Sequence, residues 1–96
     1  MKKKVFVTRR LLKENEEKLK ELFEVTLNKE DKIYNPQEII DGSKNYDGIL
    51  SSVSDPISAD TISKLSTSIK IIANGAVGFG NIDIKAAKEK GITVTN

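Results

Sequence analysis

The chain has 96 residues, 38% hydrophobic and 31% charged, which is typical of one folded domain rather than a disordered or membrane protein. It has no cysteine and no histidine, so disulfides, thiolate chemistry and imidazole catalysis by this chain are excluded. A net charge of +2 is too small to indicate a nucleic-acid partner. The opening residues lack the apolar run of a secretory signal, so we expect a cytoplasmic protein.

The first part of the sequence predicts strand, helix and strand. Residues 4–8 are a short apolar run rich in β-formers, which indicates a buried strand. A Lys- and Glu-rich helix is expected from about 12 to 22, with a solvated face carrying the pairs Glu14–Lys18 and Glu16–Lys20. Residues 23–27 predict an edge strand.

The middle of the chain predicts a second short helix and a third strand. Asn35, followed by Pro36 and Glu38, has the pattern of a helix N-cap with a capping box. Gly42 is expected to end this helix, and residues 46–52 predict the next strand.

The last part continues the alternation. Ser58 is placed to cap a third helix that residues 66–68 interrupt, and residues 69–74 predict a fourth strand. A fourth helix is expected over 83–90, with Asp83 as a capping carboxylate and Gly91 at its end. A fifth strand follows over 92–95.

Strands alternating with helices indicate one parallel sheet with right-handed crossovers. We therefore predict a flavodoxin-like α/β three-layer sandwich, with five parallel strands in the order 2-1-3-4-5. Five strands with only four helices between them leave part of one sheet face uncovered, so the sandwich is expected to be incomplete at its C-terminal side. A bare apolar face favours self-association, most simply as a dimer.

The segment 75–80, Gly-Ala-Val-Gly-Phe-Gly, follows the fourth predicted strand and is the strongest candidate for a ligand site. Three glycines in six residues allow the backbone to turn its N–H groups toward an anion. A tight turn without a ligand is an equally good interpretation of this pattern. Two further loops, Thr8–Arg10 and Ser51–Ser54, follow strands at the same edge.

Other ligands are disfavoured by spacing. The glycines do not form the G-x-G-x-x-G of a dinucleotide fold, and no Gly-Lys-Ser/Thr phosphate loop is present. Thr8-Arg9-Arg10 is unsuited to flavin phosphate, and no acidic residues stand where a phosphorylation receiver needs them. Arg9 and Arg10 could clamp a carboxylate, but solvation or salt bridging is the commoner role of such arginines.

The run from Ile71 through Asn74-Gly75 and Asn81-Ile82-Asp83 to Asn96 resembles the N-terminal half-domain of D-isomer-specific 2-hydroxyacid dehydrogenases, with the glyoxylate/hydroxypyruvate reductase branch nearest. Residues 5–9, 46–50 and 54–57 fall where that family has comparable segments. The resemblance implies a small 2-keto or 2-hydroxy acid as substrate, with backbone N–H groups at Val77 and Gly78, beside Ala76, holding its carboxylate. It implies that Ser52 and Val53 line the opposite wall.

The sequence also departs from this family. The coenzyme glycine motif and the catalytic Arg, Glu and His would come after Asn96, and Gly80 stands where the family often has Asp. We therefore expect residues 1–96 to be a single, truncated substrate-binding domain without the Rossmann coenzyme domain. Such a chain would have no catalytic residues, bind no metal and no cofactor, and be inactive alone, NAD(P) belonging to the full-length parent. The alternatives are a stand-alone small-carboxylate binding module and a structural association module.

Overall fold

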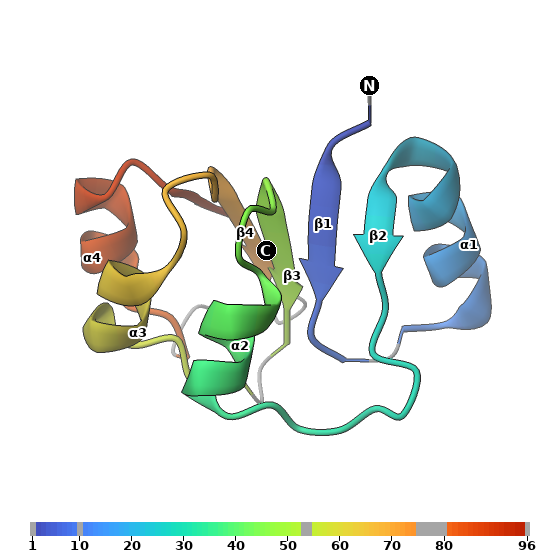
Figure 1. The fold of residues 1–96 in the computed structure, drawn as a ribbon, viewed down its shortest axis with the longest axis horizontal. Helices are drawn as coiled ribbons and strands as arrows, with labels where there is room; N and C mark the ends of the chain where they lie inside the picture. The colour runs from blue at the N-terminus through green and yellow to red at the C-terminus, as the bar shows by residue number, and fades with distance from the viewer. Residues whose placement is uncertain (1, 10, 53–54, 75–80, 96) are drawn as a thin grey trace.

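The computed structural model describes residues 2–9, 11–52, 55–74 and 81–95. Its strands pair in parallel in the order β2-β1-β3-β4-β5 (Figure 1). The predicted flavodoxin-like sandwich and strand order are therefore confirmed. The elements are, in chain order, β1 (Lys4–Val7), α1 (Lys13–Leu22), β2 (Glu24–Thr26), α2 (Pro36–Gly42), β3 (Gly48–Ser51), α3 (Ala59–Lys64), β4 (Ile71–Asn74), α4 (Ile84–Glu89) and β5 (Thr93–Thr95).

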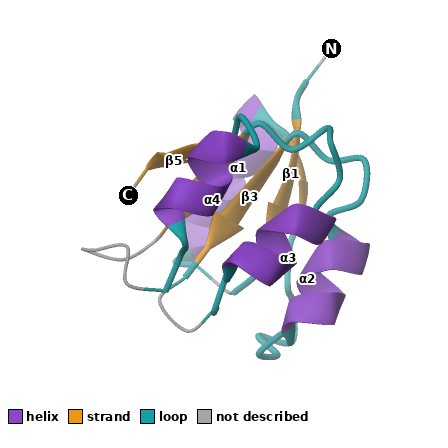
Figure 2. Cartoon of the chain, turned by 90° about the vertical axis from the view of Figure 1, so that its left-hand side faces the viewer, coloured by secondary structure: helices purple, strands orange, loops and turns teal. Residues whose placement is uncertain are grey.

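One face of the sheet carries the hydrophobic core. Ile49 on β3 and Ile72 on β4 are register partners, so their side chains point to the same face. Both are at most 1% exposed. The helices α2, α3 and α4 pack on this face, and Figure 2 shows α2 and α3 side by side against the strands. Their contributions to the core cluster are Ile39, Ile62 and Ala87.

The opposite face is covered only in part. Leu19 of α1 and Phe23 lie over it and line a cavity of about 340 Å³ with apolar residues of β1, β3 and β4. Among the described helices α1 alone lies on this side, and Ile71 is 41% exposed. We call this surface the open face and define it by Val5, Leu19, Phe23, Leu50, Ile71 and Ala73. It agrees with the uncovered stretch expected from the helix count.

The start of α2 has the predicted capping box. Asn35 accepts a hydrogen bond from the Glu38 backbone N–H at 2.8 Å, and Glu38 accepts one from the Asn35 backbone N–H at 3.0 Å. These two bonds satisfy N–H groups that the first turn of a helix leaves free. The hydrogen bond from Lys32 and that from the Asn35 backbone lower the pKa of the half-buried Glu38.

The other predicted caps are also present. Ser58 accepts from the Thr61 backbone N–H at the start of α3, and Asp83 accepts from the Ala86 backbone N–H at 3.0 Å at the start of α4. Gly91 has a φ of 81°, the left-handed conformation that ends a helix and that glycine adopts without strain. Asp83 is therefore a capping residue, as predicted.

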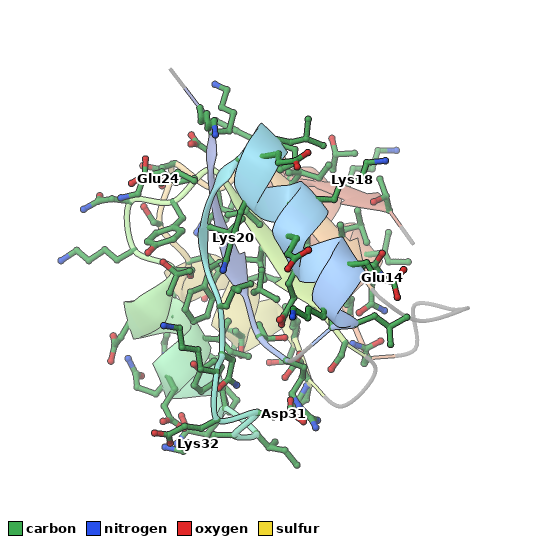
Figure 3. The ribbon with its side chains drawn as sticks, turned by 90° about the vertical axis from the view of Figure 1, so that its right-hand side faces the viewer. Glu14, Lys18, Lys20, Glu24, Asp31 and Lys32 are labelled. Atoms are coloured by element: carbon green, nitrogen blue, oxygen red, sulfur yellow. The ribbon has the colours of Figure 1, made fainter. Side chains whose placement is uncertain are left out.

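The helix α1 differs from the prediction in the position of one charged side chain. Glu14 and Lys18 are exposed, as expected of a solvated face (Figure 3). The expectation for Glu16 was wrong, because Glu16 is only 4% exposed and accepts a hydrogen bond from the Leu11 backbone N–H at 3.1 Å. It binds a free N–H at the helix start, where Leu12 has no capping side chain. None of the helices in the described ranges is long and apolar enough to cross a membrane.

Lys90 closes the C-terminal end of α3 from the neighbouring helix. Its ammonium group donates to the carbonyls of Ile62, Ser63 and Leu65 at 2.9, 3.1 and 2.6 Å. Replacing it with methionine keeps the apolar stem but leaves these carbonyls without their donor. We expect Lys90→Met to lower the free energy of unfolding by about 1–3 kcal/mol.

Urea denaturation measures this change. The matched control is Lys88→Met, since Lys88 is exposed on the same helix and should change stability by less than about 0.5 kcal/mol. Equal stabilities of the two variants would show that Lys90 does not cap α3.

Candidate functional site

Buried polar side chains gather where β1, β3 and β4 end. Thr8 follows β1 directly, Ser51 ends β3 and Asn74 ends β4. All three are at most 3% exposed. Ligands of open parallel sheets bind beyond the carboxyl ends of the strands, so this edge is the candidate site.

Asp55 joins the exits of β1 and β3. Its Oδ2 accepts hydrogen bonds from the Thr8 hydroxyl and from Ser52, whose backbone N–H lies at 2.9 Å and whose hydroxyl lies at 3.1 Å. Asp55 is fully buried, and its Oδ1 has no partner in the described part of the chain. A buried carboxylate is costly unless it is hydrogen-bonded, so the three donors to Oδ2 are what hold it there.

Amide side chains join the exits of β3 and β4. Asn74 accepts from the Ser51 hydroxyl at 3.0 Å and donates to Oδ1 of Asn81 at 2.9 Å. Asn81 in turn donates to the carbonyls of Ser52 and Asp55, both at 2.9 Å. Beyond these contacts Ile57 and Ile82 form a parallel β-bridge. The two exit loops are therefore tied together by side chains and by backbone.

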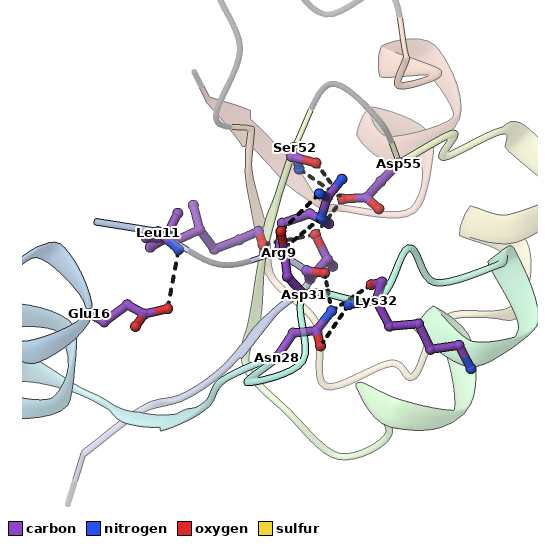
Figure 4. A network of polar contacts seen from close by, with 10 residues as sticks. Arg9, Leu11, Glu16, Asn28, Asp31, Lys32, Ser52 and Asp55 are labelled. Carbon is purple, nitrogen blue, oxygen red and sulfur yellow. Dashed lines mark hydrogen bonds and ion pairs between the residues drawn. The ribbon is translucent and has the colours of Figure 1, made fainter. Parts of the chain in front are cut away.

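A second layer of contacts covers the end of β1 (Figure 4). Asn28 is 4% exposed and donates to the carbonyls of Thr8 and Lys32 at 2.9 and 2.6 Å. Arg9 forms a two-pronged contact with Asp31, at 2.8 and 3.1 Å, and this hydrogen-bonded carboxylate raises the pKa of Arg9. Arg9 is thus salt-bridged, which is the commoner of the two roles weighed for it.

Of the residues predicted to bind substrate, Ser52 lies at this edge, half-buried, with its hydroxyl donating to Asp55. Val53, Ala76, Val77 and Gly78 lie outside the described residues. The roles of Asn28, Asn74 and Asn81 were not foreseen. The only sequence signal for them is their place after predicted strands, which is shared by many loop residues.

The described residues between β1 and α1 do not fit a dinucleotide cofactor. Thr8 and Arg9 after β1 are followed by Leu11 and Leu12, so no glycine lets a pyrophosphate approach the start of α1. That start also carries the Glu16 carboxylate, which occupies a backbone N–H and would repel phosphate. The described residues also contain no group of three or more side chains suited to a metal ion.

The chain is similar to known proteins over its whole length. A family model described as D-isomer specific 2-hydroxyacid dehydrogenase, catalytic domain, matches residues 5–96. The chain is 38% identical over 96 residues to a glyoxylate reductase of Korarchaeum cryptofilum and 33% identical to one of Pyrococcus furiosus. It covers 29% and 28% of these two relatives, so it spans less than a third of their length.

Solved structures of similar proteins have the same fold as this chain. A crystal structure described as that of an NAD-binding D-isomer specific 2-hydroxyacid dehydrogenase from Polaromonas is 31% identical, with a TM-score of 0.93 over 98% of this chain and 30% of the other. The TT0316 protein of Thermus thermophilus is 30% identical, with a TM-score of 0.82 over 97% of this chain and 30% of the other. The family match covers nearly every residue, and the relatives share the fold as well as the sequence. The chain therefore belongs to the family of D-isomer specific 2-hydroxyacid dehydrogenases.

Proposed function

We propose that this chain is the substrate-binding part of a cytoplasmic NAD(P)-dependent reductase that converts small 2-keto acids, glyoxylate or hydroxypyruvate, to 2-hydroxy acids. Two relatives that match the whole chain are glyoxylate reductases, which supports this choice of substrate. The chain has no histidine and no dinucleotide motif, so the coenzyme and the catalytic groups would come from residues that it does not contain.

In this proposal the substrate carboxylate binds beyond the ends of β3 and β4. Backbone N–H groups of Val77 and Gly78, with Ala76, hold its oxygens, and Ser52 and Val53 form the facing wall. The observation that carries the proposal is the network around Asp55 and Asn81, which fixes the described residues on both sides of this edge. Fixed flanking residues suit a small-anion site, because they lose little conformational freedom when the anion binds.

Two measurements on the purified chain test this function. We expect no turnover of glyoxylate with NADH or NADPH, because the sequence has no dinucleotide motif to bind the hydride donor, and turnover would contradict the proposal that the coenzyme binds elsewhere. Calorimetry with glyoxylate, glycerate and oxalate should show weak binding, and a complete lack of binding would contradict the substrate-binding role. Tight binding by the chain alone would instead favour the alternative of a stand-alone carboxylate sensor.

The open face favours a second role, association with another copy of the chain. Its apolar side chains surround a cavity of about 340 Å³, and exposing apolar surface costs about 25 cal/mol per Å². The same cavity is also lined by Lys3, Lys70 and Asp47. In a two-fold pair a contact between two residues occurs twice, so a rim with both signs of charge allows a lysine of one copy to face Asp47 of the other. We propose that a second copy covers this face.

Sedimentation equilibrium tests the association. The wild-type chain should have a mass approaching twice 10.6 kDa as its concentration rises. Ile71→Lys should shift the protein to monomer, because it puts an unpaired charge into the apolar contact. The matched control is Ile84→Lys, since Ile84 is 44% exposed on α4, outside the open face. A wild-type chain that stays monomeric at high concentration, or equal effects of both variants, would contradict this role.

A further inference from the structure

One side chain, that of Asn81, connects two loop segments that are far apart in sequence. Its amide nitrogen donates to the carbonyls of Ser52 and Asp55, each at 2.9 Å. Its own backbone carbonyl accepts from the Ile57 N–H at 2.7 Å. Asn81 therefore holds the chain after β3 at three points. These are the carbonyls of Ser52 and Asp55 and the backbone N–H of Ile57.

The same amide also joins the end of β4. Asn74 donates to Oδ1 of Asn81 at 2.9 Å, and its own Oδ1 accepts from Asn81 at 3.3 Å and from the Ser51 hydroxyl at 3.0 Å. Asn74 is 3% exposed and Asn81 is half-buried, so these bonds are shielded from water in large part. One hydrogen-bonded unit therefore contains Ser51, Ser52, Asp55, Asn74 and Asn81.

This arrangement needs an amide at position 81. A primary amide offers two donor hydrogens and one acceptor oxygen, and here the donors serve the 52–55 segment while the oxygen serves Asn74. Aspartate would keep the acceptor but lose both donors, and serine could not reach carbonyls on both sides. Removing the side chain takes one donor from each of these two carbonyls and breaks the side-chain link between the loops, so that the backbone bridge of Ile57 and Ile82 alone joins the described ends.

We propose that Asn81 is a positioning residue: it sets the separation of Ser52 and Asp55, after β3, from Asn74, at the end of β4, and thereby the affinity of the site for a small carboxylate. This inference rests on the proposed function, because that function assigns the substrate to Ser52 and to residues that lie between these anchors in the sequence. Asn81 acts through the backbone that it holds, and it need not contact the ligand.

The test compares Asn81→Ala with Asn15→Ala, a matched control in which an exposed asparagine of α1 is changed. NMR titration with oxalate gives the dissociation constant, and amide hydrogen exchange reports local opening. Loss of two hydrogen bonds should weaken oxalate binding about tenfold and speed exchange at Ser52 and Asp55 about tenfold relative to Ile72 in the core. Asn15→Ala should change neither quantity.

Exchange separates positioning from a general loss of stability, because global destabilisation would speed exchange at Ile72 as much as at Ser52 and Asp55. Such uniform acceleration, or an unchanged dissociation constant for Asn81→Ala, overturns the inference. If the wild-type chain binds no oxalate, the proposed function fails. The role of Asn81 in holding the two loops is then tested by hydrogen exchange alone, and it stands only if Asn81→Ala speeds exchange at Ser52 and Asp55 more than at Ile72. Where Asn81→Ala does not fold, Asn81→Asp provides the same comparison, because it keeps the acceptor for Asn74 and loses both donors to the carbonyls of Ser52 and Asp55.

Discussion

Replacing Asp55 with alanine is expected to lower the free energy of unfolding by about 2–4 kcal/mol, a large share of the roughly 5–15 kcal/mol available to a domain of this size. Asp55 is fully buried, and its Oδ2 accepts from Thr8 and from two donors of Ser52. Alanine leaves the buried Thr8 hydroxyl and the Ser52 backbone N–H without this acceptor. Urea denaturation followed by circular dichroism measures the loss.

Asp55→Asn is the matched variant. The amide oxygen can accept the same hydrogen bonds, and its nitrogen takes the place of Oδ1, which has no partner among the described residues. We expect this variant to lose less than about 2 kcal/mol, and clearly less than the alanine variant. Equal losses for both variants would show that the negative charge of Asp55 is what matters, since asparagine keeps both the volume and an acceptor oxygen.

Replacing Ile72 with alanine is expected to cost about 2–5 kcal/mol. Ile72 is fully buried in the middle of the core cluster, and truncation leaves a cavity that the neighbouring helices fill only in part. The adjacent residue is the control. Ile71 points to the open face and is 41% exposed, so Ile71→Ala should cost less than about 1 kcal/mol in dilute solution.

Thermal or urea unfolding at low and at high protein concentration measures both isoleucine variants. Association through the open face would make the cost of Ile71→Ala rise with concentration, since the dimer buries this side chain. The cost of Ile72→Ala should be independent of concentration. A large cost for Ile71→Ala in dilute solution would contradict the assignment of the two sheet faces.

The fold was predictable because its signals are local. Asn35 with Pro36 and Glu38 marks the start of α2 by chemistry contained within four residues, and Gly91 marks the end of α4 by a backbone conformation that favours glycine. The alternation of strands and helices with right-handed crossovers then leaves few topologies, and the order β2-β1-β3-β4-β5 is one of the common ones.

The site was predictable only as an edge of the sheet. Which side chains meet there depends on pairs such as Ser52 with Asn81 and Thr8 with Asp55, which lie 29 and 47 residues apart. Local pattern carries no information on such contacts. In the sequence, Asp55 before Pro56 indicates only a turn. Glu16 has the spacing of an exposed ion pair, but it is buried because it accepts a hydrogen bond from the Leu11 backbone N–H. Each case is a polar group whose partner is set by tertiary structure.

Backbone amide shifts on addition of oxalate show where a small carboxylate binds. We expect the shifts to be confined to Ser52, Asp55 and the stretch from Asn74 to Asn81, after the carboxyl ends of β3 and β4. Shifts centred on Ile71 and Leu50 of the open face, or no shifts at any oxalate concentration, would contradict a carboxylate site at this edge.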